Sequence, residues 1–363
     1  MFLTLISMFV LLFSAWYVPF RWKRLARRKR IWPWQIAAFI FLAGYLLLLM
    51  SGLYTSRILF FAILYNIYGL LFIFYFYLFL YLFLTHLAGP LLKEISGKAI
   101  LGAGVLLCAG IVGFGFFQAR SFTVTMHEIQ VQGLEHPVSI LHIPDLHLGA
   151  QRSEAYVEKV LEVIRNRKPD MVIYNGDMVD SNIALRPELF ALFRKVPCEQ
   201  YFTTGNHEFY MDTSKALALI ASSGIRILRN EMVETHGLQV IGLEYMNADK
   251  NTYDSHKVND LTIEEELPKI RREKTKPSLL LHHSPVGMSY AAKGGINIML
   301  TGHTHAGQLF PANFLVPLRF PMYKGRYQIG GTTLLVSQGA GTFGPWMRLG
   351  TFNEIQLVRL IPR

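Results

Sequence analysis

The first third of this chain contains four apolar runs, and a soluble domain cannot bury so many of them in succession. The runs cover residues 2–20, 31–50, 58–84 and 100–117. A helix that crosses the bilayer needs about 20 mostly apolar residues, so each run is long enough or nearly so. The sequence therefore predicts a transmembrane region at residues 1–118, with about four helices. The remainder, residues 121–363, has the composition of a globular domain.

Charge is divided as unevenly as hydropathy. Residues 1–120 hold 11 of the 36 basic residues but only 1 of the 25 acidic ones, and seven of the basic residues lie in the loop from Arg21 to Arg30. Basic loops stay on the cytoplasmic side. If all four runs cross, the globular domain is extracytoplasmic on a multi-pass protein of the cell membrane; if one run does not, the answer reverses. The basic excess thus indicates a bilayer partner, and no nucleic-acid partner is expected.

Five apolar segments of the globular part end in residues that can bind metals. Apolar runs alternate there with helical patterns, as in layered α/β folds. The five segments, 139–143, 171–174, 200–203, 278–281 and 296–300, are followed in turn by PDLH, NGD, GNHE, HHSP and TGHTH. The carboxyl ends of strands are where such folds place their sites. We therefore expect these five loops to meet.

The residue types in these loops favour one kind of chemistry. Imidazole, carboxylate and amide oxygen are ligands for Mn²⁺, Fe²⁺/³⁺ or Zn²⁺. Residues two apart on an extended segment point to one side, so Asp145 with His147, and His303 with His305, are expected to point together. Asp177 is the candidate to bridge two metals, and such a pair forms a clamp for displacement at phosphorus. Two divalent metal ions are therefore the expected cofactors.

The ordered motifs resemble those of the calcineurin-like metallophosphoesterase superfamily. Its pattern, DxH…GD…GNH…H…GHxH, is present from Asp145 to His305. The tail "GRYQIGGTTLLVSQGAGTFG" resembles a branch of membrane-associated bacterial phosphoesterases and transmembrane proteins with a metallophosphoesterase domain. The resemblance covers roughly residues 121–363 and implies a four-layer αββα sandwich.

Carried over position by position, the resemblance implies a role for each motif residue. Asp145, His147, Asp177 and His305 would hold one metal, and Asp177, Asn206, His283 and His303 the other. A metal-bridging hydroxide would be the nucleophile. His207 would be the general acid or a donor to a phosphate oxygen.

Three neighbours of these motifs need separate interpretation. Glu208 is either an orienting partner of His207 or an exposed carboxylate at a helix start. Asp180 is expected to bond local backbone rather than bind metal. His283 rather than His282 is the ligand, because His283-Ser284-Pro285 fits the family's His-x-Pro and alternation turns His282 to the other face.

Substrate and oligomeric state stay open at this level. The expected substrate is a phosphodiester, phosphomonoester or pyrophosphate. The apolar stretch at residues 310–323, FPANFLVPLRFPMY, is either ordinary packing or a contact with a lipid or lipid-linked substrate. A metal-binding sensor or regulatory protein on a phosphatase scaffold is the alternative. A transporter is disfavoured, because the apolar runs contain few polar groups.

Overall fold

The computed structural model describes residues 2–27, 30–53, 58–150, 152–252 and 258–363, without the side chains of residues 2–9. The chain forms two compact units. Residues 1–117 with Gly344–Met347 make up the first, and residues 118–343 with 348–363 make up the second. The predicted boundaries, 1–118 and 121–363, stay a prediction.

The first unit is built from four helices, α1 Phe2–Ala26, α2 Trp32–Met50, α3 Leu59–Leu87 and α4 Gly97–Gln118. Among the described residues, α2, α3 and α4 are long and apolar enough to cross a membrane. These three correspond to the predicted runs at 31–50, 58–84 and 100–117. The fourth predicted span, 2–20, falls in α1, but residues 2–9 lie outside the described side chains. That span, and the sidedness that depends on it, stay predictions.

Tyrosine hydroxyls join the helices of this unit. Tyr75 of α3 donates to the Ser14 carbonyl of α1 at 2.7 Å, and Tyr81 donates to the Ile100 carbonyl of α4 at 2.9 Å. Tyr68 donates to the Phe41 carbonyl of α2 at 3.1 Å. Lipid offers polar side chains no partners, so interhelical bonds of this kind suit a membrane bundle. These three tyrosine hydroxyls thus take part in packing between the helices.

The second unit contains two mixed six-stranded sheets. Their orders are β1-β12-β2-β3-β4-β5 and β10-β11-β9-β8-β7-β6. In the first sheet β2, β3, β4 and β5 run parallel, and in the second β7, β8, β9 and β11 do. The first sheet comprises β1 Phe122–Val131, β2 Val138–His142, β3 Met171–Asn175, β4 Glu199–Thr203, β5 Arg226–Ile227 and β12 Asn353–Pro362. The second comprises β6 Glu231–Thr235, β7 Leu238–Gly242, β8 Ser278–Leu281, β9 Ile298–Thr301, β10 Gly325–Ile329 and β11 Thr332–Val336.

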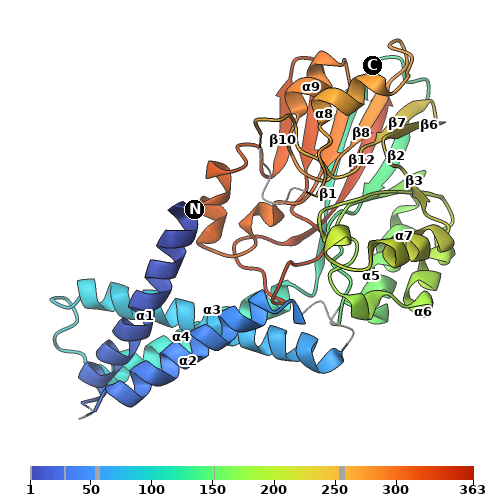
Figure 1. The fold of residues 1–363 in the computed structure, drawn as a ribbon. Coiled ribbons are helices and arrows are strands. Elements are labelled where there is room, and N and C mark those ends of the chain that lie inside the picture. The colour runs from blue at the N-terminus through green and yellow to red at the C-terminus, as the bar shows by residue number, and fades with distance from the viewer. Residues whose placement is uncertain (1, 28–29, 54–57, 151, 253–257) are drawn as a thin grey trace. The chain divides into compact units, whose positions relative to one another are not determined.

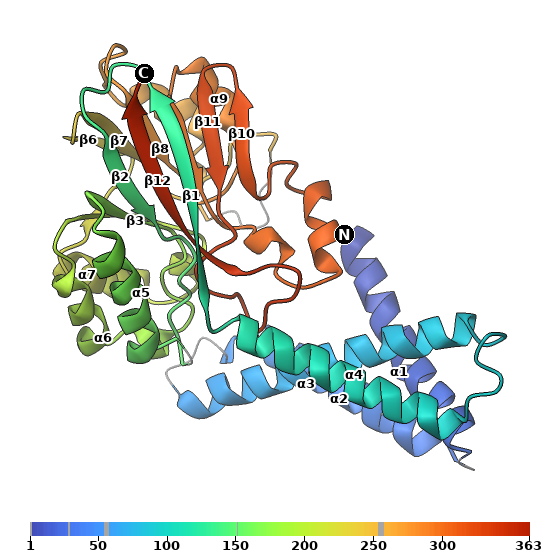
Figure 2. The same ribbon diagram turned by 180° about the vertical axis from the view of Figure 1, so that it is seen from behind.

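Helices cover the outer face of each sheet (Figure 1). The first sheet carries α5 Glu154–Arg167, α6 Pro187–Ala191 and α7 Thr213–Ser222, while α8 Ile263–Glu266 and α9 Met288–Lys293 lie on the second. Seen from behind, β1 and β12 lie side by side through their length (Figure 2). The 3-10 turns are η2 Asn182–Ala184, η3 Leu192–Lys195, η4 His207–Tyr210, η5 Leu267–Lys269, η6 His305–Gly307, η7 Ala312–Phe314 and η8 Val316–Leu318.

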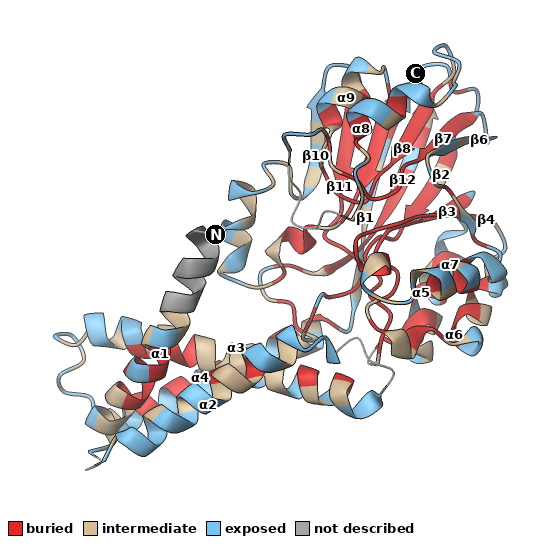
Figure 3. Cartoon of the chain, viewed as in Figure 1, coloured by how far each residue is buried: buried red, intermediate tan, exposed pale blue. Residues whose placement is uncertain are grey.

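Three buried cores separate these layers. Alternation along β2 sends Leu141 into the core under the α5 side and Ile140 into the core between the sheets. Along β8, Leu279 faces the first sheet and Leu280 faces α8 and α9. Strands covered on both faces are buried throughout, as Figure 3 shows for the central strands. The predicted αββα sandwich is confirmed, and the five predicted ligand-bearing strands are β2, β3, β4, β8 and β9.

Candidate metal centre

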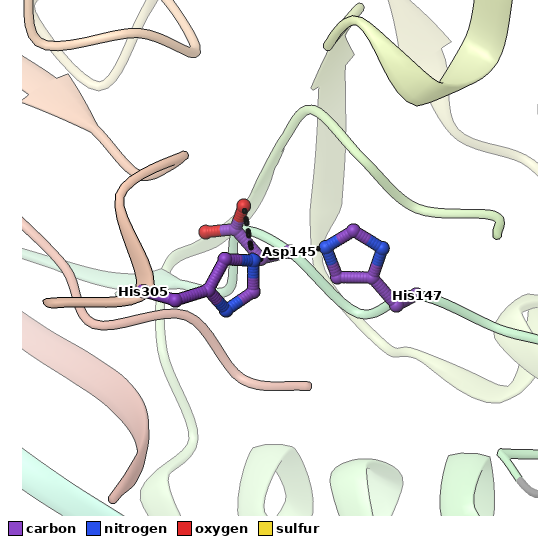
Figure 4. A group of neighbouring side chains, drawn as sticks. All are labelled: Asp145, His147 and His305. Carbon is purple, nitrogen blue, oxygen red and sulfur yellow. Dashed lines mark hydrogen bonds and ion pairs between the residues drawn. The ribbon is translucent and has the colours of Figure 1, made fainter. Parts of the chain in front are cut away.

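Loops after β2 and β9 bring Asp145, His147 and His305 together. Their ligand atoms all lie within 4.8 Å of one another, and Figure 4 shows the three side chains turned toward a common point. His147 Nε2 lies 3.0 Å from His305 Nε2, and Asp145 Oδ1 lies 3.5 Å from His305 Nε2. All three residues are buried. Burial lowers the pKa of both histidines, so both imidazoles are neutral and keep a lone pair for a ligand.

Loops after β3, β8 and β9 bring Asp177, His283 and His303 together in a second group of the same compactness. Asp177 Oδ2 lies 3.1 Å from His283 Nε2. The same oxygen lies 3.8 Å from His147 Nε2 in the first group. Asp177 thus stands between the two groups, as a bridging ligand must.

The donor atoms fit a pair of cations. Two nitrogens bound to one ion at about 2.1 Å and a right angle lie about 3.0 Å apart, which is the separation of the His147 and His305 nitrogens. His283 Nδ1 lies 2.8 Å from the Asn175 carbonyl. That bond leaves Nε2 facing the Asp177 carboxylate, and a proton or a metal is needed between them. Asn206 Oδ1 is likewise buried without a hydrogen-bond donor.

Charge at the centre also favours cations. Burial raises the pKa of Asp177, but His283, His207 and His147 outweigh it and hold that pKa well below its usual range. Burial lowers the pKa of His283, and Asp177 and Asp145 outweigh it and raise the pKa to about 10. In the absence of metal, His283 therefore holds a proton beside the carboxylate, which a metal ion would displace.

The backbone departs from the extended form expected for the paired ligands. Asp145, His147, Asp177, His303 and His305 all have φ between 48° and 72°. The predicted reason for their convergence, alternation along an extended segment, is therefore wrong. It is also wrong that His303 and His305 point together, since His305 joins Asp145 and His303 joins Asp177. Asp145 and His147 do join one group, as expected, although both are left-handed, whereas the left-handed turns at His303 and His305 direct these two imidazoles to different groups.

Asp180 pairs with two histidines, so the expectation that it bonds local backbone is wrong. Its Oδ1 lies 2.9 Å from His207 Nδ1 and 3.4 Å from His147 Nδ1. His207 is thereby turned with Nε2 toward Asp177, 3.9 Å from Oδ2. Burial lowers the pKa of His207, but Asp177 and Asp180 outweigh it and raise the pKa to about 9.

Glu208 is not exposed, and its carboxylate bonds backbone N–H groups while its charge helps to raise the pKa of His207. It is fully buried, and its carboxylate accepts hydrogen bonds from the backbone N–H groups of Asp177, Met178, Val179 and Gly205. Burial, followed by the charge of Asp177, raises the pKa of Glu208 to about 7. Four converging donors favour its ionised form. Glu208 thus ties the loop after β3 to the loop after β4.

His282 lies on the other face, as the alternation along β8 predicts. Its Nδ1 lies 2.8 Å from the Ser284 carbonyl, and its Nε2 accepts from the Met246 N–H at 3.3 Å. His283 therefore enters the second group and His282 supports the loops behind it.

Sequence reasoning missed Arg348, the largest fully buried side chain among the described residues. Its guanidinium donates to the carbonyls of His305 at 3.0 Å, Gln338 at 2.6 Å and Gly341 at 2.6 Å. Gly341 in turn donates its N–H to the Asp145 carbonyl at 2.6 Å. Arg348 therefore joins the two loops that carry Asp145 and His305. Arg348 lies outside the five ligand motifs, so no sequence pattern indicated its role.

Arg152 does the same for His147. The guanidinium donates to the His147 carbonyl and to Thr342 Oγ1, and it lies 3.6 Å from Asp180 Oδ2. Arg152 follows the strand-end motif by five residues and has no recognisable spacing. Arg152 contacts His147 and Asp180 only through the tertiary fold.

Comparisons with known proteins show which family this chain is similar to. Residues 138–307 match the sequence profile of the calcineurin-like phosphoesterase family. An uncharacterized metallophosphoesterase of Aquifex aeolicus is 30% identical over 250 residues, which are 68% of this chain and 92% of that protein.

Two further relatives are longer than the region that they share with this chain. An uncharacterized metallophosphoesterase of Helicobacter pylori strain J99 is 30% identical over 65% of this chain and 63% of its own length. A transmembrane protein with metallophosphoesterase domain from Bos taurus is 30% identical over 71% of this chain and 60% of its own length. The chain thus spans about three fifths of these two relatives.

Among solved structures, TT1561 of Thermus thermophilus is 14% identical, with a TM-score of 0.38 over 56% of this chain and 89% of that one. A dimetal phosphatase from Danio rerio is 13% identical, with a TM-score of 0.37 over 56% of this chain and 87% of that one. Likenesses at this level do not bear on activity.

Proposed function

Because this chain belongs to the calcineurin-like phosphoesterase family, we propose that it is a membrane-anchored hydrolase of phosphoric esters that uses two divalent metal ions. The observation that carries the proposal is the pair of His/Asp groups, of which the second contains Asp177 and the first lies 3.8 Å from the Asp177 carboxylate, with His207 facing the same carboxylate. Asp145, His147, Asp177 and His305 would hold one cation, and Asp177, Asn206, His283 and His303 the other. Mn²⁺, Fe²⁺/³⁺ and Zn²⁺ all suit these donors.

Bound cations would neutralise charge on the phosphoryl oxygens and lower the pKa of a water molecule. The chain's own residues would supply orientation and a proton. His207, with its pKa raised to about 9, is protonated at neutral pH and would give its Nε2 proton to the leaving oxygen. Asp180 would hold the ring by Nδ1. Glu208 and Arg348 would fix the loops that carry the ligands.

The bond that is cleaved is open among phosphodiester, phosphomonoester and pyrophosphate. The full-length chain in detergent, stripped of metal and reloaded, would be assayed on bis-p-nitrophenyl phosphate and p-nitrophenyl phosphate. We expect metal-dependent turnover that is lost in Asp177→Asn and in His207→Ala. Glu162→Gln, an exposed change on α5, is the control. Binding of two ions without turnover of either ester would favour the alternative, a metal-binding sensor or regulatory protein.

We also propose that the globular unit is extracytoplasmic on a multi-pass anchor. The support is the basic loop from Arg21 to Arg30 together with the three apolar helices. A single cysteine at Ser121, after removal of Cys108 and Cys198, should react with an impermeant maleimide in intact cells. Reaction only after lysis would place the domain inside.

A lipid or lipid-linked phosphoester is the substrate class that we favour. Three residues separate the end of α4 at Gln118 from the start of β1 at Phe122. At about 3.5 Å per residue, the four steps from Gln118 to Phe122 keep the start of β1 within roughly 14 Å of the end of α4. A phosphoester at the bilayer surface would therefore be close to the globular unit.

A further inference from the structure

The segment Phe310–Leu318, here the apolar segment, exposes large apolar side chains beside the candidate centre. Phe310 is 45% exposed, Phe314 68%, Leu315 57% and Leu318 77%. The segment forms two short 3-10 turns, η7 and η8. Single exposed apolar residues are ordinary, but four within nine residues mark a surface that something covers.

The outward face of the apolar segment carries no charge. Its one polar side chain, Asn313, packs inward, where a Cβ added at Gly350 would lie 3.0 Å from Asn313 Nδ2. Phe310 and Phe314 pack edge to face, with ring centroids 5.7 Å apart. The exposed face is therefore apolar, and a ring contact holds two of its side chains together.

The apolar segment is fastened at both ends to the loops of the metal centre. Before it, the Gln308 side chain exchanges two hydrogen bonds of 2.8 Å with the Phe343 backbone. After it, the Phe320 ring packs on His303 at 5.5 Å, and Thr304 Oγ1 donates to the Tyr323 carbonyl at 2.6 Å. Whatever covers the segment is thus brought to the candidate ligands.

Aromatic side chains also lie beside His207 at the candidate centre. Phe343 is 51% exposed, and its ring centroid lies 5.5 Å from that of His207. The Tyr210 ring lies 5.1 Å from the same imidazole, and its hydroxyl accepts from Asn206 Nδ2 at 2.9 Å. Two arginines beside the centre, Arg152 and Arg348, are buried and donate to protein acceptors. A small water-soluble anion would find aromatic rings at the entrance, whereas an amphiphile would find a matching surface.

From these contacts we infer that the apolar segment inserts into the interface of a lipid bilayer and presents the centre to the phosphoester of a membrane-embedded amphiphile. The second half of this inference rests on the proposed function; the first does not. Arg319 and Lys324 follow the segment in sequence. Cations beside an inserted apolar face suit anionic headgroups. The three helices that are long and apolar enough to cross a membrane would hold the chain at a bilayer.

Depth in the membrane tests the insertion without any substrate. The full-length chain, with Cys108 and Cys198 replaced, carries a nitroxide at Leu318→Cys or at the control Glu162→Cys, in vesicles of phosphatidylcholine and phosphatidylglycerol. We expect the label at 318 to be accessible to oxygen and shielded from a water-soluble nickel chelate, and the label at 162 to show the reverse. Equal access of the chelate to both labels would overturn the inference. Shielding that vanishes at one chain per vesicle would overturn it too, because a second copy would then be the cover.

Turnover tests the substrate class. Phe314→Ser/Leu315→Ser/Leu318→Ser should cut the rate on an acylated p-nitrophenyl phosphodiester in the same vesicles by ~10-fold or more. The rate on soluble bis-p-nitrophenyl phosphate should stay unchanged, as should the melting temperature. Ile329→Ser, 40% exposed on β10, is the matched control. Equal losses on both substrates would refute the lipid substrate. If the wild type turns over neither ester, the proposed function fails, while the depth result still decides the insertion.

Discussion

Five of the seven candidate metal ligands hold their backbone in the left-handed region. Non-glycine residues rarely adopt it, because each such position costs on the order of 1–3 kcal/mol and persists only where the surroundings enforce it. Here the surroundings do: the His147 N–H bonds the Asp177 carbonyl at 2.9 Å, and the Asp145 N–H bonds the Gly176 carbonyl at 3.0 Å. The ligand loops therefore brace one another through their backbones.

At the residue scale, Asp180 is expected to act through His207. Asp180→Asn should lower kcat by roughly 10²-fold or more, since a positioned general acid contributes that much. Because Asp180 helps to raise the pKa of His207, its loss should move the basic limb of the pH–rate profile to lower pH. Metal content, measured by elemental analysis, should hold. An unchanged profile with normal metal content would show that the pair has no part in proton transfer.

Arg348 makes a different prediction at the same scale. Arg348→Met removes the donor that joins the Asp145 and His305 loops, so the chain should retain one metal ion fewer after dialysis. The group around Asp177, His283 and His303 should keep its ion. Arg359→Met, an exposed change on β12, serves as control. Full metal content in Arg348→Met would mean that the loops hold their positions without the guanidinium.

At the element scale, the loops after the strands approach one another too closely for side chains. A Cβ on Gly205 would collide with the Asp177 carboxylate and lie 2.5 Å from its backbone nitrogen. Gly205→Ala should therefore displace the bridging candidate and cut activity by ~10²-fold, since a shift of about 1 Å costs that much. Gly331→Ala, where an added Cβ meets nothing within 4 Å, should be neutral. Comparable kcat/KM values for the two variants would contradict the bridging role.

The elements that bear ligands could be predicted because two sequence signals mark each strand: an apolar run and the polar motif that follows it. Periodicity also separated His282 from His283. It failed for Asp180 and Glu208, whose partners lie on loops about 30 residues away in sequence. It failed for Arg348 as well, which reaches back to His305 across the β10–β11 hairpin. Such contacts depend on tertiary packing, which no local pattern encodes.

At the scale of the whole molecule, protons on His207 and His283 are expected to balance the carboxylate charge of the centre when no metal is bound. In the metal-free fold, the pKa is raised to about 9 for His207 and to about 10 for His283. Protonation of these two residues therefore contributes its full stabilisation at pH values below the ordinary histidine pKa of 6.5. That stabilisation is lost as pH rises from 6.5 through about 9 for His207 and through about 10 for His283. The melting temperature of the metal-free chain, followed by near-ultraviolet circular dichroism, should fall over this window. Mn²⁺ should restore more stability at pH 9 than at 6.5, since it no longer competes with protons. A flat or rising metal-free curve would contradict the charge assignment.

The central claim is that five strand ends assemble one centre for two metal ions around Asp177, and a metal titration tests it most directly. Metal-free full-length chain would be titrated with Mn²⁺ while bound metal and hydrolysis of bis-p-nitrophenyl phosphate are measured in the same samples. We predict that turnover rises with the second equivalent and that Asp177→Asn loses both the second ion and the activity. Full turnover at one equivalent, or an Asp177→Asn variant that still binds two ions and hydrolyses the ester, would contradict the account.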